Sequence, residues 1–386
     1  MTMKSGTGAA RPAPTTKAQA QKWLAALASP RILLYALPWL MLLLAAGTVA
    51  QKDLGLYAAQ NLYFSAWIVW LGPLPLPGTY AALSLITLCL LAKFLFYSRW
   101  SLKRAGTILT HFGVLVLMIG GLLTALTQEE GYLALHEGEE KQVVSDYHDR
   151  EFVIEKDGKP HLSFPFETLK AGQTIEAGGA MRLTIADICR HCRPHPAPEE
   201  PAAAPRRGLA AKIMLRKAAP EKEDEANLSG LTFRVESPDA EQNGLYIAME
   251  DIPHRAALHD GGSSYEIFVR RRETILPFSV TLARFQRDMH PGTDNPRSFT
   301  SAILINDDGV EWPAQISMNE PLRYKGYTFY QSSFAVRPDG EVSILSVVRN
   351  KGRVFPYIAS ALIFAGLVLH VFLRAREKSM GGKRIK

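Results

Sequence analysis

Four long apolar runs divide the chain into membrane-like and polar parts. They cover residues 32–50, 80–98, 106–126 and 355–373, and a polar block separates the third run from the fourth. Each run has close to the twenty residues that an α-helix needs to cross about 30 Å of hydrocarbon. The pattern predicts an integral membrane protein with four transmembrane helices, three before the polar block and one after it.

The polar block, residues 127–354, has the pattern of a β-rich domain. Short runs rich in β-branched and aromatic residues, such as 152–154, 182–185, 265–269 and 342–348, are typical of strands. The turn signals Asp157-Gly158, Asp308-Gly309 and Asp339-Gly340 separate them. A two-sheet sandwich is the expected class. Two stretches, 194–207 and 218–227, are rich in Pro and Ala or in charge and are expected to be solvated insertions.

The connection between the first and second runs is too apolar for a solvated loop. Trp67 and Trp70 lie in it and are followed by Pro73, Pro75 and Pro77. Tryptophan is enriched where a membrane meets water, so this segment suits a position among the lipid headgroups. The alternative is that it only anchors the helix bundle.

Charge is distributed unevenly, and its distribution predicts the topology. Residues 127–354 hold 28 Lys and Arg against 35 Asp and Glu, whereas the rest of the chain holds 16 basic and 2 acidic residues. Most of those basic residues flank the apolar runs, in the segments 1–31, 99–104 and 374–386. By the positive-inside rule, both termini are cytoplasmic and the acidic block lies outside. The basic overall charge therefore reports membrane topology, and a nucleic-acid partner is not expected.

The N-terminal part allows a second reading. Residues 1–31 form a basic cytoplasmic segment that is expected to be disordered at least as far as Lys17. A basic leader, an apolar stretch and the ending Thr48-Val49-Ala50 also fit a cleaved signal peptide, although the leader and the apolar run are long for one. Residues 374–386 form a basic cytoplasmic tail after the last span.

The third run contains a histidine and a stripe of glycines. Gly106, Gly113 and Gly120 recur every seven residues and line one helix face, which allows a neighbouring helix to approach closely. His111 lies about 140° or more from that face, at 100° per residue. Because an ionisable residue at membrane depth is costly, His111 is a candidate functional residue, with a purely structural histidine as the alternative.

The fourth run contains a second histidine, His370, four residues before Arg374. His111 lies near the start of an outward-running helix and His370 near the end of an inward-running one, so both fall in the cytoplasmic half. Two imidazoles at similar depth are able to ligate one haem iron from its two sides. An interfacial histidine without a ligand is the alternative for His370.

Cys189-Arg190-His191-Cys192, with His195 three residues later, is the second cluster with chemical potential. Covalent haem attachment requires a histidine directly after the second cysteine, and Arg193 occupies that position. A disulfide or redox-active pair, a zinc site formed by Cys189, Cys192, His191 and His195, and free thiols all remain open. Cys89 lies within the second span and is expected to be an inert, buried thiol.

Five sequence segments resemble the ResB (CcsB) family of cytochrome c biogenesis proteins of the type II system. They are THFGVLVLMIGG (110–121), GYLALHEGE (131–139), HPGT (290–293), ISMNEPL (316–322) and YKGYTFYQSSF (324–334). The order of the parts, three spans, an outer domain and a last span, is similar to that family as well. The resemblance extends from about residue 30 to 375.

This resemblance implies a function. The family works with a CcsA-type membrane protein to deliver haem b to apocytochrome c, and the third-span histidine, here His111, is thought to ligate haem within the membrane. The chain then acts as a subunit of a cytochrome c synthetase complex in the bacterial inner membrane, without performing the thioether chemistry alone. The tryptophan-rich haem segment of the partner is not found in this sequence, and the cysteine pair is not a family feature.

Two function classes therefore stand side by side. The first is the haem-handling component just described, with a thioredoxin-like thiol reductant as a further candidate partner for the cysteine pair. The second is a membrane-anchored scaffold or sensor whose outer domain binds only protein and which holds no haem. A haem absorbance band in the purified protein separates the two.

Overall fold

The computed structural model describes residues 16–198, 204–293, 296–338 and 340–382. The chain forms two compact units: a membrane unit (Met1–Asp53, Ala58–Leu126 and Gly352–Lys386) and a β unit (Leu54–Tyr57 and Thr127–Lys351). The disorder predicted for the N-terminus falls mainly on residues 1–15, which lie outside the described residues. The same holds for residues 199–203 of the first predicted insertion and for Asp339 of the last predicted turn.

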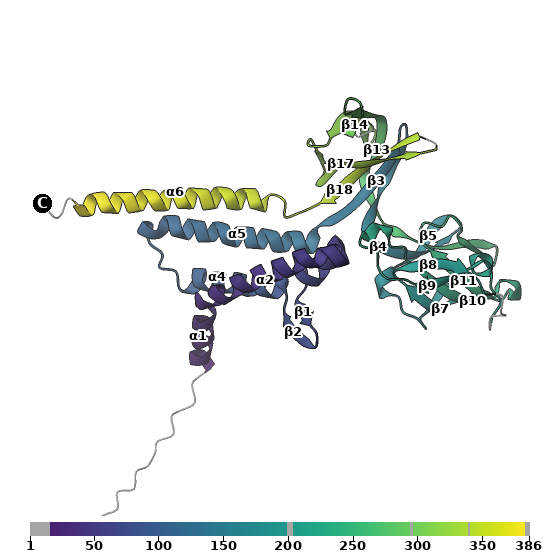
Figure 1. Ribbon diagram of the computed structural model, residues 1–386, viewed down its shortest axis with the longest axis horizontal. Helices are drawn as coiled ribbons and strands as arrows, with labels where there is room; N and C mark the ends of the chain where they lie inside the picture. Colours follow the sequence, from purple (N-terminus) through teal and green to yellow (C-terminus); the bar gives the residue numbers. More distant parts are fainter. Residues whose placement is uncertain (1–15, 199–203, 294–295, 339, 383–386) are drawn as a thin grey trace, which may run out of the picture. The chain divides into compact units, whose positions relative to one another are not determined.

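Four helices of the described chain are long and apolar enough to cross a membrane, which confirms the predicted class (Figure 1). They are α2 (Arg31–Leu54), α4 (Thr79–Phe96), α5 (Ala105–Thr127, preceded by the 3-10 turn η2, Leu102–Arg104) and α6 (Phe355–Gly382). A shorter helix, α1 (Thr16–Leu27), precedes α2. Between 11 and 22 % of each apolar window is buried within the chain, so most of the helix surface is left for lipid or for another protein.

The segment between α2 and α4 folds back along α2. It contains α3 (Leu56–Ala59), the π-helix η1 (Gln60–Phe64) and a hairpin of β1 (Ile68–Leu71) and β2 (Leu74–Pro77). The Trp39 indole N–H of α2 donates a hydrogen bond of 2.8 Å to the Pro77 carbonyl oxygen. The Thr79 hydroxyl, at the start of α4, donates one of 2.8 Å to the Tyr63 carbonyl oxygen. These contacts fix the hairpin to the apolar part of the membrane unit.

The β unit contains the strands that the sequence predicts, and two hydrophobic cores. Its first core is a sandwich. A four-stranded sheet, in the order β11-β10-β7-β6, packs against β5, β4, β13 and β12. These strands are β4 (Glu140–Lys156), β5 (Lys159–Pro165), β6 (Thr174–Gly178), β7 (Met181–Cys189), β10 (Gly230–Glu236), β11 (Gly244–Met249), β12 (Ala256–Asp260) and β13 (Ser263–Met289). Phe152, Phe233 and Tyr265 are among the fully buried side chains between the layers.

The second core lies inside a curved sheet in the order β15-β14-β13-β4-β3-β18-β17-β16. Its further strands are β3 (Glu129–His136), β14 (Pro296–Asp307), β15 (Val310–Ser317), β16 (Leu322–Tyr324), β17 (Tyr327–Arg337) and β18 (Gly340–Arg349). Leu135, Phe278 and Phe329 are buried at its centre. At the two ends of the sheet, Trp312 of β15 and Tyr324 of β16 make an edge-to-face ring contact, so the sheet curls toward closure.

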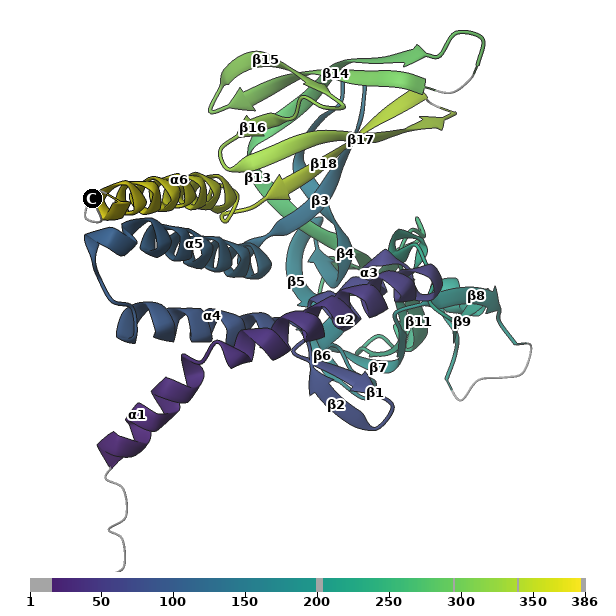
Figure 2. The same cartoon turned by 60° about the vertical axis from the view of Figure 1, so that its left-hand side comes forward.

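The long strands β4 and β13 take part in both cores (Figure 2). Their pairing shifts register between Arg271 and Glu273 and again between Ile275 and Val280, where one core gives way to the other. Because a register shift turns side chains to the other face, one strand can serve two cores. We call the segment between the two cores, residues 146–150 and 270–273, the waist.

Shorter elements complete the β unit. The hairpin of β8 (Cys192–Pro196) and β9 (Ile213–Lys217) encloses a small third hydrophobic cluster that contains Cys189 and Met249. The remaining 3-10 turns are η3 (Phe166–Thr168), η4 (Gly208–Ala211), η5 (Asp224–Ala226) and η6 (Ala240–Gln242). The turns at Asp157-Gly158 and Asp308-Gly309 have positive φ at all four residues, as type I′ hairpin turns require.

Candidate functional site

The glycine face of α5 packs directly against α6, which confirms the predicted close helix contact. A Cβ on Gly106 would lie 2.6 Å from the His370 Cα, and one on Gly113 would lie 2.7 Å from the Ile363 side chain. On α6, a Cβ on Gly366 would lie 2.6 Å from the Thr110 backbone nitrogen. Figures 1 and 2 both show the two helices side by side. Residues without side chains allow this approach, and van der Waals contact between the backbones then holds the pair.

His111 lies on the exposed surface of α5, away from that contact. Its Nδ1 lies 2.8 Å from the carbonyl oxygen of Thr107, one helical turn earlier. A carbonyl oxygen only accepts, so Nδ1 must carry the proton and the neutral ring keeps its lone pair on Nε2. A backbone hydrogen bond that fixes the tautomer in this way is the usual support of a metal-ligating histidine.

His370 on α6 is half-buried and lies near the same residue. Its Nδ1 is 3.1 Å from the Thr107 hydroxyl oxygen. Thr107 therefore contacts both candidate histidines, His111 through its backbone and His370 through its side chain. The backbone of His370 lies at the level of Gly106, five residues before His111, which is about 7.5 Å along the helix. Whether both imidazoles hold one haem stays a prediction.

An apolar groove is lined by residues of α4, α5 and α6, and His111 is not one of them. Phe112, Ile108 and Ala105 of α5 line it together with Phe94 of α4, and Trp100 and Leu369 contribute from the connecting loop and from α6. The cavity measures about 730 Å³. The Phe94 ring stacks on Phe112 at a centroid distance of 6.1 Å and meets Trp100 edge-on at 5.1 Å. The groove therefore offers flat aromatic surfaces, one of them at Phe112, the residue that follows His111 in the sequence.

Cys189 and Cys192 form a disulfide, the first of the three alternatives that the sequence left open. Both cysteines are buried, and the Nδ1 atom of the neighbouring His191 is buried without a hydrogen-bond partner in the described chain. His195 lies on β8, in an exposed position. Across the described residues, no three His, Cys, Asp or Glu side chains are arranged to hold a metal ion. The arrangement therefore supports the disulfide.

The waist of the β unit holds a buried ionic network that the sequence reading missed. Arg150 Nε lies 3.0 Å from Glu250 Oε2, Arg271 Nε lies 3.0 Å from Glu250 Oε1, and His148 Nδ1 lies 2.7 Å from Asp224 Oδ2. Arg150 Nη2 also donates a hydrogen bond of 3.0 Å to the Asn227 carbonyl oxygen. Asp224 and Asn227 belong to the stretch 218–227, which was expected to be a solvated insertion and is instead anchored here.

The network shifts the pKa of Arg150 and the pKa of Asp224. Burial alone would lower the pKa of Arg150, but the charges of Glu250 and Asp224 hold it above its ordinary value. Burial would raise the pKa of Asp224, but the hydrogen bond with His148 and the charge of Arg150 hold it below its ordinary value. The Tyr57 ring, in the short segment that follows α2, stacks on His148 at 3.7 Å.

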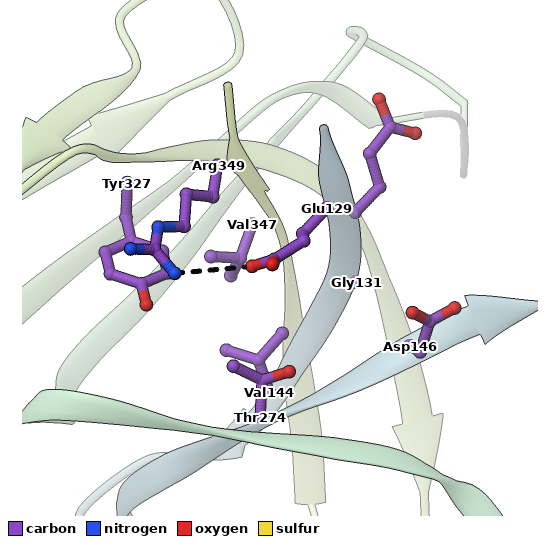
Figure 3. A pocket seen from close by; sticks show the side chains of 9 residues that line it. Glu129, Gly131, Val144, Asp146, Thr274, Tyr327, Val347 and Arg349 are labelled. Atoms are coloured by element: carbon purple, nitrogen blue, oxygen red, sulfur yellow. Dashed lines mark ion pairs between the residues drawn. The ribbon is translucent and has the colours of Figure 1, made fainter. Parts of the chain in front are cut away.

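Two features of the β unit involve the segments that carry the family resemblance. Gln331, in the YKGYTFYQSSF segment, is buried and bonded to Ser301 at 2.6 Å and to Ser343 at 3.1 Å, so this part of the motif has a structural role. Gly131, Asp146 and Tyr327 line a small pocket beside the ion pair of Arg349 and Glu129, whose nitrogen and oxygen lie 3.5 Å apart (Figure 3). Its volume of about 20 Å³ admits no more than a water molecule.

Signals for the missed residues exist in the sequence but are weak. Asp146-Tyr147-His148-Asp149-Arg150 is a polar run directly before a buried strand segment, and Arg270 to Arg272 form an equally polar run in the paired strand. Buried charges are costly unless paired, so two such runs on neighbouring strands indicate an ionic network. Thr107 gave no signal beyond its place one turn before His111.

Comparison with known proteins finds a family match within the β unit. The sequence profile of the ResB-like family matches residues 255–344. Protein NrfI of Wolinella succinogenes is 34% identical over 99 residues, which are 25% of this chain and 11% of the relative. Cytochrome c biogenesis protein CcsB of a Picosynechococcus strain is 37% identical over 65 residues, 17% of this chain and 14% of the relative. The chain thus matches only a small part of each relative, and the profile match includes neither His111 nor His370.

Proposed function

We propose that the chain, whose residues 255–344 match the ResB-like family, is a membrane component of cytochrome c biogenesis that handles haem b on its way to apocytochrome c. The observation that carries the proposal is the state of His111. Its Nδ1 proton is held by the Thr107 carbonyl, which leaves the Nε2 lone pair available on an exposed side chain within an apolar span. In this function haem is the cargo, and His111 is its ligand in the membrane.

An apolar surface near His111 is needed for a haem bound there. An imidazole bound to iron through Nε2 would leave the porphyrin to rest on apolar surface, and the groove that begins at Phe112, the next residue along α5, offers such surface. The second axial ligand comes from His370 or from a CcsA-type membrane protein. His370 is the candidate within this chain because its imidazole and that of His111 both contact Thr107.

The proposed partners fit the helix surface that is not buried within the chain. Its four helices bury little of their surface against one another, so a CcsA-type membrane protein has ample apolar surface to bind. Apocytochrome c is the acceptor of the haem, and a thioredoxin-like reductant of Cys189 and Cys192 is the third candidate partner. The thioether chemistry is assigned to no residue of this chain.

The multi-pass membrane location is given by the four helices, and the orientation is part of the proposal. Basic residues cluster before α2, between α4 and α5, and in the last turns of α6, which by the positive-inside rule puts these ends in the cytoplasm. The β unit then lies outside the bacterial inner membrane, where c-type cytochromes receive their haem.

Cytochrome maturation in cells tests the proposal. His111→Ala removes the imidazole and should abolish haem-stained c-type cytochromes in membranes, while the protein itself stays at its normal level by immunoblot. Leu117→Ala is the matched control, because Leu117 is an exposed residue of the same helix and has no proposed contact with haem. Normal cytochrome levels in His111→Ala cells would refute the ligand assignment.

One observation favours the second candidate, a scaffold or sensor whose outer domain binds only protein. The family match lies wholly in the β unit, away from both histidines. If this candidate is correct, the purified protein carries no haem even with a CcsA-type protein co-expressed, and His111→Ala is silent.

A further inference from the structure

The hairpin of β1 and β2 exposes an unusual amount of apolar surface. Ile68, Trp70, Leu71 and Leu74 and the preceding Trp67 are between 52 and 69 % exposed. The 39 residues from Leu54 to Ala92, which include the hairpin, contain no Asp, Glu, Lys or Arg. A patch of this kind marks a surface that another apolar phase covers.

The backbone of β2 is suited to an apolar environment. Leu71 and Leu74 flank a two-residue turn, with Gly72 at a φ of 60°, and exchange backbone hydrogen bonds as the pair next to the turn. The pairs then alternate, so Pro75 opposite Trp70 and Pro77 opposite Ile68 occupy the positions whose N–H groups would point away from β1. Proline has no N–H, and the outer edge of β2 therefore presents no backbone donor at these positions.

The position of the hairpin identifies what covers it. Its base is bonded to Trp39, within the apolar part of α2, and α4 begins two residues after Pro77. The hairpin thus leads directly into the membrane helix α4, and its base contacts the membrane helix α2. Tryptophan pairs are typical of the layer between headgroups and acyl chains. The N–H groups of Ile68 and Trp70 point away from β2 and still need acceptors, which excludes the hydrocarbon centre, where open sheet edges do not occur.

We propose that this hairpin is embedded in the interfacial layer of the lipid bilayer, with its β2 edge toward the acyl chains and its β1 edge toward the headgroups and water. The partner is the lipid of the leaflet that surrounds the start of α4. This role is independent of haem, and it makes the connection between α2 and α4 a membrane-inserted element. Proline on the open edge also prevents a second strand from pairing there.

Spin-label accessibility tests the proposal in the full-length protein, reconstituted in phosphatidylcholine vesicles. On a Cys89→Ser background, Leu71→Cys and Trp70→Cys carry nitroxide labels. Val368→Cys, on the exposed surface of α6, is the lipid-facing reference, and Val310→Cys, at the exposed start of strand β15, is the water-facing reference. Each label is measured for collision with oxygen, which concentrates in lipid, and with a water-soluble nickel complex.

Labels at both hairpin positions should be more accessible to oxygen than the label at Val310, and more accessible to nickel than the label at Val368, as a position between water and hydrocarbon requires. Accessibility to nickel as at Val310 would place the hairpin in water and overturn the proposal. Protection from both reagents would mean that protein covers the hairpin, and would overturn it equally. The two positions lie on different faces of the hairpin, so agreement between them excludes a local effect of one substitution.

Discussion

The glycine contact between α5 and α6 permits a quantitative test. In Gly106→Ala, the new Cβ would lie 2.6 Å from the His370 Cα and 2.7 Å from the Gly366 carbonyl oxygen. Non-bonded carbons prefer about 3.5–4.0 Å, so α6 must move away by about 1 Å. Both obstructing atoms belong to backbone and cannot rotate aside. Overpacking of this kind costs about 1–3 kcal/mol, and the shift also draws His370 away from Thr107.

Gly121→Ala is the matched control because a Cβ at Gly121, on the same helix, meets nothing within 4 Å. Both variants gain about 1 kcal/mol of helix propensity over glycine, but only Gly106→Ala pays for the clash. Because the propensity gain is the same in both, we expect the two free energies of unfolding to differ by about 1–3 kcal/mol, with Gly106→Ala the less stable. Denaturant titration in mixed micelles, followed by circular dichroism, measures the difference. Equal stabilities would refute the close α5–α6 contact.

Three further predictions concern the β unit. Arg150→Met leaves Glu250 and Asp224 each without one cation, so it should lower the free energy of unfolding by about 3–5 kcal/mol in urea titrations. Arg255→Met, at an exposed ion pair, is the control and should lower it by less than about 1 kcal/mol. The pKa of Asp224 is lower in the folded state than its ordinary value of 3.8, so the charged carboxylate stabilises the fold fully above that value. This stabilisation is lost as the pH falls through 3.8 toward the folded pKa. Thermal unfolding of Asp224→Asn should therefore show a smaller acid destabilisation than wild type, and an unchanged acid profile would contradict this. Replacing Cys189 and Cys192 with Ser opens a four-residue loop, which should cost about 2 kcal/mol or less and leave haem binding intact; loss of haem from the folded variant would contradict a purely structural disulfide.

The sequence predicted the features that depend on periodicity and composition. Four apolar runs of sufficient length gave the four helices, the seven-residue glycine repeat gave the close contact of α5 with a neighbour, and Asp-Gly pairs gave two hairpin turns. These are local signals, and each is read from residues adjacent on one element.

The rest depends on contacts between residues distant in sequence. Nothing in the sequence of β4 or β13 alone shows that each strand serves two cores, because the register shifts arise from pairing between them. Asp224 looked solvated because its partners, His148 and Arg150, lie more than 70 residues away. The link from His370 to Thr107 spans 263 residues and depends on how α5 and α6 pack.

The haem content of the purified protein tests the central claim most directly. The full-length chain, co-expressed with a CcsA-type membrane protein and purified in detergent, should show a Soret band and a stoichiometric pyridine haemochrome. His111→Ala should lose this haem while its circular dichroism stays that of wild type, and added imidazole should restore part of the band by occupying the vacated ligand position. A His111→Ala protein with the haem content of wild type would contradict the account.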